Sequence, residues 1–264
     1  MFPGNLLTIA SSLFYIMKNR RRKLEKIFKI FSSPSLIHCS GQFTKCLAMH
    51  IMEGFLPKKW ALIWFIIAAP FVIYGLKKIT EIGKNDPDKK LLLALAGAFV
   101  FLLSSLKLPS VTGSCSHPTG VGLGITIFGP APMFVLGTIV LIFQALLLAH
   151  GGLTTLGANA FSMAIAGPIV GYLVYKALRK AGVKDLVAVF ITATIADLFT
   201  YVVTSFQLGL AFPAGNMMGE VVKYLAIFAT TQVPIAIMEG ILTTLIYDKV
   251  KEYGGAGEFV EKVN

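Results

Sequence analysis

Long apolar stretches, separated by short polar or glycine- and proline-rich segments, dominate the chain from Trp60 onward. These stretches lack the strict alternation of barrel strands, and a helix satisfies its own backbone hydrogen bonds, so the pattern predicts membrane-spanning helices. The predicted limits are 60–76, 91–106, 119–128, 133–149, 160–178, 186–206 and 220–247. The sequence therefore predicts an all-α, polytopic membrane protein with about seven transmembrane helices.

The third stretch is short for a full crossing, and one alternative joins it to the fourth, which leaves six helices. Gly129, Pro130 and Pro132 interrupt that longer helix. A proline inside a helix removes a hydrogen-bond donor and clashes with the preceding turn. The interruption favours two separate helices.

The distribution of positive charge also favours seven spans, because Lys and Arg concentrate in the inward-facing segments of polytopic proteins. With residue 49 outside, the outer segments carry Lys58, Lys59, Lys107 and Lys223. The inner segments then carry Lys77, Lys78, Lys84, Lys89, Lys90, Lys176, Arg179, Lys180, Lys184, Lys249 and Lys251. This topology places the segments around His50 and His117 on the same, outer face.

Composition agrees with a membrane protein. The 264 residues are 55% hydrophobic and 14% charged, and the mean hydropathy is +0.74, more apolar than an ordinary soluble domain. The formal charge of +11 does not indicate nucleic-acid binding, because residues 1–48 alone carry a net charge of +7. The three cysteines, Cys39, Cys46 and Cys115, form no CxxC pair, so they predict neither a disulfide framework nor a zinc cluster.

Residues 1–48 differ in sequence pattern from the rest of the chain. The apolar segment Phe2–Met17 precedes the basic segment Lys18–Lys29, which reverses the order of a secretory signal. We interpret residues 1–48 as an N-terminal extension, either a start codon assigned too early or a leader cleaved after Ala48. Residues 49–264 are then the integral membrane domain. A retained extension is the remaining alternative.

The segment Met49–Pro57 (MHIMEGFLP) carries candidate chemistry. If Met49 is the mature N-terminus, its amine, the His50 amide nitrogen and the His50 ring form a chelate with three nitrogens in nearly one plane. His117, in the polar segment between two spans, would supply a fourth nitrogen. Such a set suits Ni(II) or Cu(II) and can hold Co(II), whereas Zn(II) prefers a tetrahedron. The alternative is that both histidines are merely interfacial, and the residues alone leave that open.

Three stretches together closely resemble the CbiM family of substrate-capture (S) components of energy-coupling-factor transporters for cobalt, related to nickel counterparts. They are Met49–Pro57, Gly113–Gly124 (GSCSHPTGVGLG) and Leu146–Ser162 (LLLAHGGLTTLGANAFS). The resemblance covers essentially residues 49–264. It implies that the mature N-terminus begins at Met49 and inserts into the bundle, with the Met49 amine, the His50 amide and ring, and His117 as metal ligands.

The resemblance further implies uptake of cobalt(II) as transported substrate, with no permanently bound cofactor, for cobalamin biosynthesis. Its implied partners in the cell membrane are two ATPase subunits, a transmembrane coupling (T) protein and a small accessory membrane protein. Met52 and Glu53 stand where nickel members usually carry Pro and Asp, so the chain is similar to the cobalt version. Nickel(II) uptake by the same architecture is the nearest alternative.

Several polar residues are candidates for supporting roles. Ser114, Ser116, Thr154 and Asn159 are candidates to brace the ligands or the N-terminal segment by hydrogen bonds. For His150, we favour a helix-ending or loop-bracing role over metal ligation. Asp197 and Glu239 lie within spans, where ionisable groups usually face the bundle interior or a polar cavity, and the sequence does not decide their roles.

Catalytic motifs are absent from the sequence. It contains no GxxxxGK[ST] phosphate loop, no HExxH pair and no GxSxG elbow, so we predict that the chain is not an enzyme. Two alternative functions stay open. One is an intramembrane zinc metalloenzyme that uses His117, His150 and a carboxylate, and the other is a purely structural membrane subunit.

Overall fold

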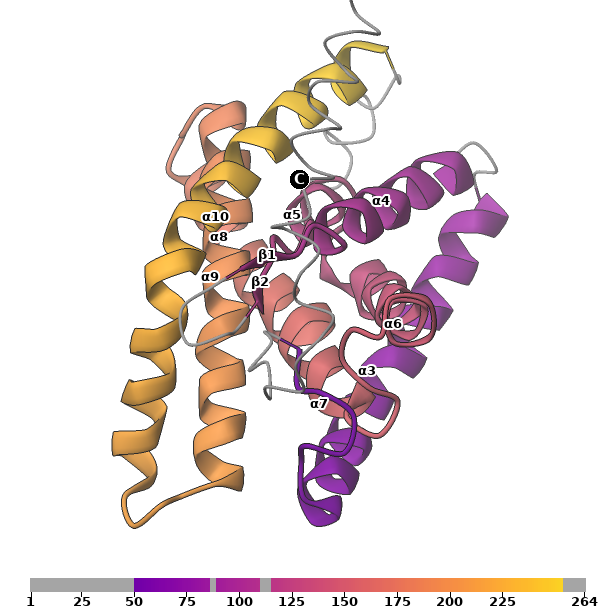
Figure 1. Ribbon diagram of the computed structural model, residues 1–264. Helices are drawn as coiled ribbons and strands as arrows, with labels where there is room; N and C mark the ends of the chain where they lie inside the picture. Colours follow the sequence, from indigo (N-terminus) through magenta and orange to yellow (C-terminus); the bar gives the residue numbers. More distant parts are fainter. Residues whose placement is uncertain (1–49, 86–88, 110–114, 254–264) are drawn as a thin grey trace, which may run out of the picture. The chain divides into compact units, whose positions relative to one another are not determined.

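The computed structural model describes residues 50–85, 89–109 and 115–253, and these residues form a helical bundle (Figure 1). The helices are α3 (Lys58–Asn85), α4 (Lys89–Ser104), α5 (Val121–Phe128), α6 (Pro130–Leu147), α7 (Leu156–Asn159), α8 (Gly167–Lys180), α9 (Asp185–Ala211) and α10 (Met217–Tyr253). A π-helical stretch, η3 (Ala160–Ala166), joins α7 to α8. Two short strands, β1 (Leu108–Pro109) and β2 (Cys115–Ser116), pair antiparallel.

All seven predicted segments are helical, which confirms the all-α, multi-pass fold. Five helices are long and apolar enough to cross a membrane in the part of the chain described, with α7, η3 and α8 counting as one crossing from Leu156 to Lys180. The prediction placed the end of α3 too early, at residue 76. The helix continues to Asn85 because the polar residues beyond the apolar stretch, chiefly Lys and Glu, are also good helix formers.

The short third segment is an internal element and not a full crossing. Helix α5 has eight residues, all of them buried, and would extend only about 12 Å along its axis. It contacts α4, α6, α8, α9 and α10. Gly129 ends it with a positive φ of 78°, and Pro130 opens α6 at its first turn, where the missing N–H of a proline costs nothing. The predicted break at residues 129–132 is confirmed.

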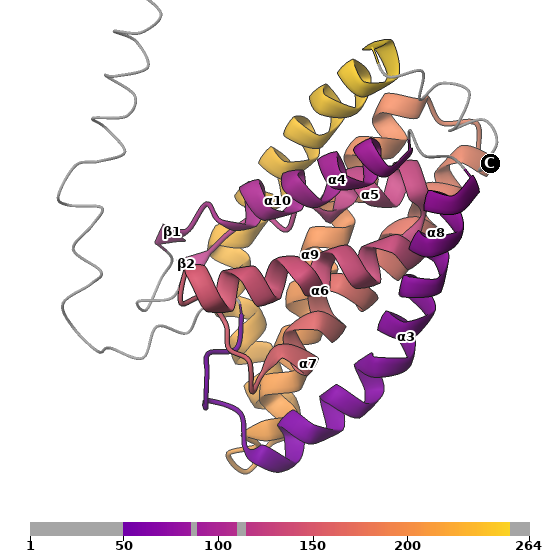
Figure 2. The ribbon, with the colours of Figure 1, turned by 90° about the vertical axis from the view of Figure 1, so that its right-hand side faces the viewer.

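Helices α9 and α10 run side by side as an antiparallel pair, and α8 packs against α9 (Figures 1 and 2). Small residues allow the close packing of α8 against α9. A Cβ atom added to Gly167 would lie 2.6 Å from the Thr200 hydroxyl, and one added to Gly171 would lie 2.9 Å from the Cβ of Ala196. The Gly167–Gly171 step therefore serves packing inside the bundle. On the other side, α3 packs along α6 and α7.

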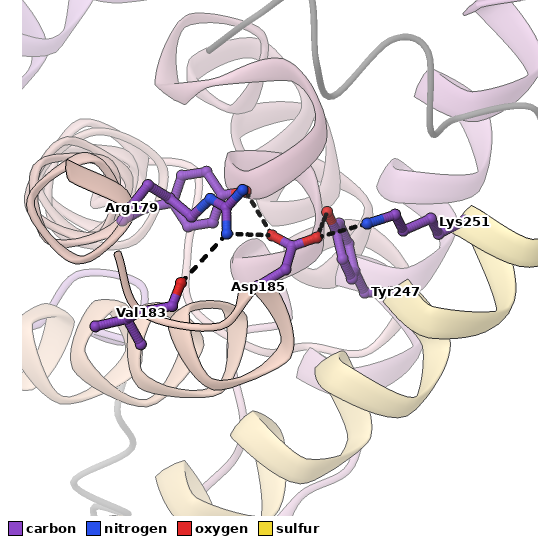
Figure 3. A network of polar contacts seen from close by, with 6 residues as sticks. Arg179, Val183, Asp185, Tyr247 and Lys251 are labelled. Carbon is purple, nitrogen blue, oxygen red and sulfur yellow. Dashed lines mark hydrogen bonds and ion pairs between the residues drawn. The ribbon is translucent and has the colours of Figure 1, made fainter. Parts of the chain in front are cut away.

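A polar hub on Asp185 joins α8, α9 and α10 (Figure 3). The hydroxyl of Tyr247 and the ammonium of Lys251 each donate to Asp185 Oδ2 at 2.9 Å, and the Tyr175 hydroxyl donates to Oδ1 at 3.2 Å. The guanidinium of Arg179 lies 3.7 Å from Oδ1. Since Asp185 also opens α9, its charge lies where the dipole of that helix favours an anion.

Replacing Asp185 by Asn tests this hub. Asn keeps the shape but loses the charge that four donors share, so we expect Asp185→Asn to reduce stability by about 1–3 kcal/mol. The readout is the temperature at which the detergent-solubilised protein loses its monodisperse gel-filtration peak. Glu252→Gln is the matched control, because it removes only the exposed pair with Lys249 and should cost less than about 1 kcal/mol. Equal effects of the two variants would contradict a stabilising hub.

Candidate metal centre

Three histidines from distant parts of the sequence meet in the bundle. His50 precedes α3, His117 follows β2 and His150 follows α6, and their side chains are 1%, 0% and 4% exposed. The ring centroids lie 4.7 Å (His50–His117), 4.8 Å (His50–His150) and 4.9 Å (His117–His150) apart. One ring nitrogen from each lies within 4.8 Å of the others, a spacing that can hold a metal ion. The structure brings His50 and His117 together, as predicted, and their position on the outer face of the membrane stays a prediction.

The segment that carries His50 is pinned to α7 and the loop before it. The Asn159 side chain forms two hydrogen bonds with the Ile51 backbone. Its Oδ1 accepts from the Ile51 N–H at 2.8 Å, and its Nδ2 donates to the Ile51 carbonyl at 3.1 Å. The Thr155 hydroxyl donates to the same carbonyl at 2.6 Å. Residues 50–51 are therefore inserted and buried, although they have no helical hydrogen bonds.

The loop 151–154 fits closely against this segment. The Gly54 N–H donates to the Thr154 hydroxyl at 3.1 Å, and the Thr154 N–H donates to a Glu53 carboxylate oxygen at 3.2 Å. Gly151 has a φ of +76°, and a Cβ there would lie 3.3 Å from the Cβ of His50. The bracing contacts predicted for Thr154 and Asn159 are present, and Glu53 holds the segment as well.

Gln144 of α6 is a functional candidate that the sequence reasoning missed. Its Oε1 lies 3.1 Å from His50 Nε2, and its Nε2 donates to the Ser104 hydroxyl at 2.5 Å. Its backbone carbonyl accepts from the His150 N–H at 3.1 Å. One buried residue therefore contacts two of the three histidines, and His50 Nδ1 is the ring nitrogen that this contact leaves free. The available signal was a lone amide in the apolar run 133–149, six residues before His150.

The backbone after His117 is held by side chains of α9 and α10. The Tyr201 hydroxyl donates to the His117 carbonyl at 3.0 Å, as does Gln232 Nε2 at 3.3 Å. The Glu239 carboxylate accepts from the N–H groups of Thr119 and Gly120 at 2.5 and 2.9 Å. Glu239 thereby holds the backbone that leads into α5, a packing role that the sequence left undecided.

Two further predicted or undecided residues belong to this region. Gln232 Nε2 also donates to Asp197 Oδ2 at 2.5 Å, so Asp197 supports the residue that holds the His117 carbonyl. The hydroxyl of Ser116 lies 2.9 Å from that of Thr231, which ties β2 to α10. Met49 and Ser114, both predicted site residues, lie outside the described residues, as does the extension 1–48.

His150 is the residue whose predicted role changes most. It does follow the end of α6, as expected, but its ring joins the cluster instead of only bracing the loop. Its Nε2 and that of His117 are buried and have no hydrogen-bond partner among the described residues. The ring Nδ1 of His117 lies 2.9 Å from the Pro118 carbonyl and donates to it in the matching tautomer. In that tautomer, His117 Nε2 carries the free electron pair of the ring.

Burial keeps these rings neutral. Desolvation lowers the pKa of His117 from 6.5 to about 4. Desolvation and the neighbouring His117 hold the pKa of His50 well below its ordinary value, and desolvation and His50 do the same for His150. A neutral imidazole offers its lone pair to a cation without first losing a proton. The three rings are therefore neutral at neutral pH, which is the protonation state that metal ligation requires.

Fold and site together define a class: a multi-pass helical membrane protein that buries three neutral imidazoles at a spacing suited to a metal ion. Comparison with known proteins narrows this class. The chain belongs to the CbiM family, described as a cobalt uptake substrate-specific transmembrane region, whose match covers residues 50–254.

The relatives are named as transport proteins. The cobalt transport protein CbiM of Clostridioides difficile (strain R20291) is 64% identical over 209 residues, covering 78% of this chain and 84% of that protein. The cobalt transport protein CbiM of Nostoc sp. (strain PCC 7120) is 60% identical over 208 residues, covering 78% and 80%. Among solved structures, the crystal structure of a transition metal transporter has the same fold, with a TM-score of 0.69 at 24% identity over 77% of this chain and 92% of that one.

Replacing Gln144 by Ala tests its part in the centre. The variant frees His50 Nε2 and should weaken metal binding on the order of 10- to 100-fold, because residues that orient ligands typically contribute that much. Titration calorimetry with Co(II) on the purified chain measures it. Gln207→Ala is the control, since Gln207 is equally buried but donates to the Ala158 carbonyl. Unchanged affinity in Gln144→Ala would refute the orienting role.

The lowered pKa values predict acid sensitivity of the metal-free protein. An unfolded histidine takes up a proton below about pH 6.5, whereas folded His117 does so only near pH 4, so stability is full above pH 6.5 and falls between pH 6.5 and 4. His117 alone accounts for up to about 3 kcal/mol of this loss. His117→Phe should therefore flatten the dependence of the unfolding temperature on pH over this range. An unchanged slope would show that His117 titrates normally in the folded protein.

Proposed function

We propose that this chain captures cobalt(II) at the outer face of the cell membrane and passes it inward as the substrate-binding component of an energy-coupling-factor transporter. The observation that carries the proposal is the buried histidine cluster, in which the free nitrogens of His117 and His150 converge with His50. Relatives at 57–64% identity are named cobalt transport proteins. The transported ion is the substrate, not a resident cofactor, and we propose no enzymatic reaction.

The proposed mature chain begins at Met49 and lacks residues 1–48. The family match beginning at residue 50 supports this start. A chain that begins there has its amine one residue from buried His50, and the Asn159 contacts to Ile51 would hold that end in place. With an upstream extension, the same nitrogen would be an amide with no basic lone pair. The amine would also be missing from the ligand set.

The proposed ligands are the Met49 amine, the His50 amide nitrogen, His50 Nδ1 and His117 Nε2. Because Gln144 contacts His50 Nε2, the other ring nitrogen, Nδ1, is free. Nδ1 is the ring atom that can close a small chelate ring with the backbone nitrogen. Contact of His117 Nδ1 with the Pro118 carbonyl leaves Nε2. These nitrogens would replace the water shell of the ion. The hydrogen bonds of Ser116, Thr154 and Asn159 would keep the ligands aligned.

Release requires the His50 segment and the His117 loop to separate. The first is held by α7 and the loop before it, the second by α9 and α10, so a relative movement of these two groups of helices would pull the ligands apart. We propose that two ATPase subunits, a transmembrane coupling protein and a small accessory membrane protein supply this movement. The released cobalt would serve cobalamin biosynthesis.

Nickel(II) is the second candidate substrate, because four nitrogens near one plane suit that ion. An intramembrane zinc metalloenzyme has less support. That reading needs a carboxylate beside His117 and His150, and the cluster found in the described part of the chain contains three histidines and no carboxylate.

The deciding experiment combines the N-terminal mass of the membrane-purified chain with its metal affinity. We expect a chain that starts at Met49 and binds Co(II) at about one ion per chain. Both His50→Ala and His117→Ala should weaken binding by at least about 100-fold, since each removes a ligand. Thr230→Ala, at a residue whose hydroxyl donates to its own helix, is the control.

Three outcomes would contradict the proposal. Tight Co(II) binding by a chain that starts upstream of Met49 would exclude the amine as a ligand. Tighter binding of Ni(II) than of Co(II) would select the nickel alternative. Retention of Zn(II) by His50→Ala would support the metalloenzyme.

A further inference from the structure

The carboxyl groups of Asp197 in α9 and Glu239 in α10 are fully buried in the bundle and lie within hydrogen-bonding contact of each other. In the part of the chain that the structure describes, neither forms an ion pair with a Lys, Arg or His. Two ionised carboxylates in contact repel each other strongly where water is excluded. The pair therefore requires a positive charge between its oxygens, which is either a proton or a metal cation.

Free oxygen atoms lie beside this pair. Asp197 Oδ1 and Gln232 Oε1 are buried and have no hydrogen-bond partner among the described residues. Gln232 Nε2 donates to Asp197 Oδ2 at 2.5 Å, and Oε1 is bonded to the same carbon atom as that Nε2, so the free amide oxygen stays close to the carboxyl group. A buried oxygen without a partner is costly. Carboxylate and amide oxygens are, however, good ligands for divalent cations.

Glu239 adds fixed negative charge to these free oxygens. Its carboxylate accepts from the N–H groups of Thr119 and Gly120 and from the Thr119 hydroxyl, at 2.5, 2.9 and 3.0 Å. Those donors lie at the start of α5, where the dipole of that helix also favours an anion. The Glu239 carboxylate is thus held in place, whereas Asp197 Oδ1 is available to a cation.

Along α9, the pair lies between the histidine cluster and the hub on Asp185. Tyr201, which donates to the His117 carbonyl, comes one helical turn after Asp197, and Asp185 begins the helix. The hub adjoins residues 181–184, which the distribution of positive charge assigns to the inner side of the membrane. The pair is therefore the next charged group inward from the residues that hold His117.

Along α10, buried polar residues follow the same direction. Four of them share one face of the helix at helical spacing: Gln232, Glu239, Thr243 and Tyr247. The first contacts the His117 carbonyl, and the last donates to Asp185. Thr243 Oγ1 has no hydrogen-bond partner among the described residues. Because α9 and α10 pack side by side (Figure 1), polar groups follow their interface from the segment that carries His117 to the hub.

We propose that Asp197, Glu239 and Gln232 form a second cation site, which receives the divalent metal ion after the histidines release it and passes it inward along the α9–α10 interface. This inference rests on the proposed function and adds a step to it. Ionisable residues inside membrane proteins commonly mark ion pathways. The second site binds through oxygen atoms and so holds Co(II) more weakly than the nitrogen ligands do. A passing ion needs such a weak site, because it must also leave.

The first test measures Mn(II) binding to the purified full chain that carries His117→Ala, which disables the histidine site. Mn(II) prefers oxygen ligands, so we expect about one bound ion per chain, seen as a decrease in the electron paramagnetic resonance signal of free Mn(II). Adding Asp197→Asn should lower the Mn(II) affinity by at least about tenfold, since it removes a charged ligand. Asn keeps the size of the side chain and an acceptor for Gln232. Asp248→Asn, at an exposed acid of α10, is the control.

The second test uses the chain with its histidines intact. It compares the effect of Asp197→Asn on the Co(II) affinity of the purified chain with its effect on Co(II) uptake by cells that express the complete transporter. A site that acts after capture affects the rate of transport more than the affinity. We therefore expect the loss in uptake to exceed the loss in affinity by at least about tenfold. Asp248→Asn is again the control.

The outcomes separate this inference from the proposed function. If the wild-type chain neither binds nor takes up Co(II), the proposed function fails. If it does both, and Asp197→Asn changes neither Mn(II) binding nor uptake, capture stands and the second site is refuted, which leaves a shared proton between the two acids. Equal losses in Co(II) affinity and uptake would also refute it, because Asp197 would then act only through the His117 carbonyl. If Asp197→Asn does not fold, Thr243→Val, which keeps its shape and removes a free hydroxyl, is judged by the same comparison of uptake with affinity.

Discussion

Non-helical backbone can lie inside a membrane protein only where other groups satisfy its hydrogen bonds. The structure meets this requirement for the segment that begins at His50 through one residue above all. Asn159 pairs with both the N–H and the carbonyl of Ile51. Those bonds hold Ile51, so the preceding imidazole lies buried in the bundle. The histidine cluster therefore depends on this segment staying inserted.

The same requirement explains the irregularities around the site. Asn159 lies at the end of α7, and the helix continues as the π-helical stretch η3, a local change of winding that recurs at functional sites. On the opposite side, Glu239 and Tyr201 satisfy the backbone from His117 to Gly120. Two separate sets of hydrogen bonds thus present two histidines to each other. The site is held together by the bundle and not by any continuous element of its own.

Much of the fold could be predicted because hydrophobic length and charge asymmetry are local properties of the sequence. The seven helical segments, the break at Pro130 and the proximity of His50 and His117 followed from those patterns. The internal position of α5 could not be predicted, because eight apolar residues have the same sequence pattern whether lipid or protein surrounds them. Its full burial is a consequence of five neighbouring helices.

The site was predictable only where polar residues stood out from their surroundings. Thr154 and Asn159 were candidates to brace the N-terminal segment, and each makes a hydrogen bond with the segment that carries His50. Gln144 and His150 were harder, because one amide in an apolar helix and one histidine at a helix end have several ordinary explanations. What distinguishes them is convergence: Gln144 contacts the His50 ring with its side chain and the His150 N–H with its carbonyl. That relation joins residues 94 positions apart, so only the folded chain contains it.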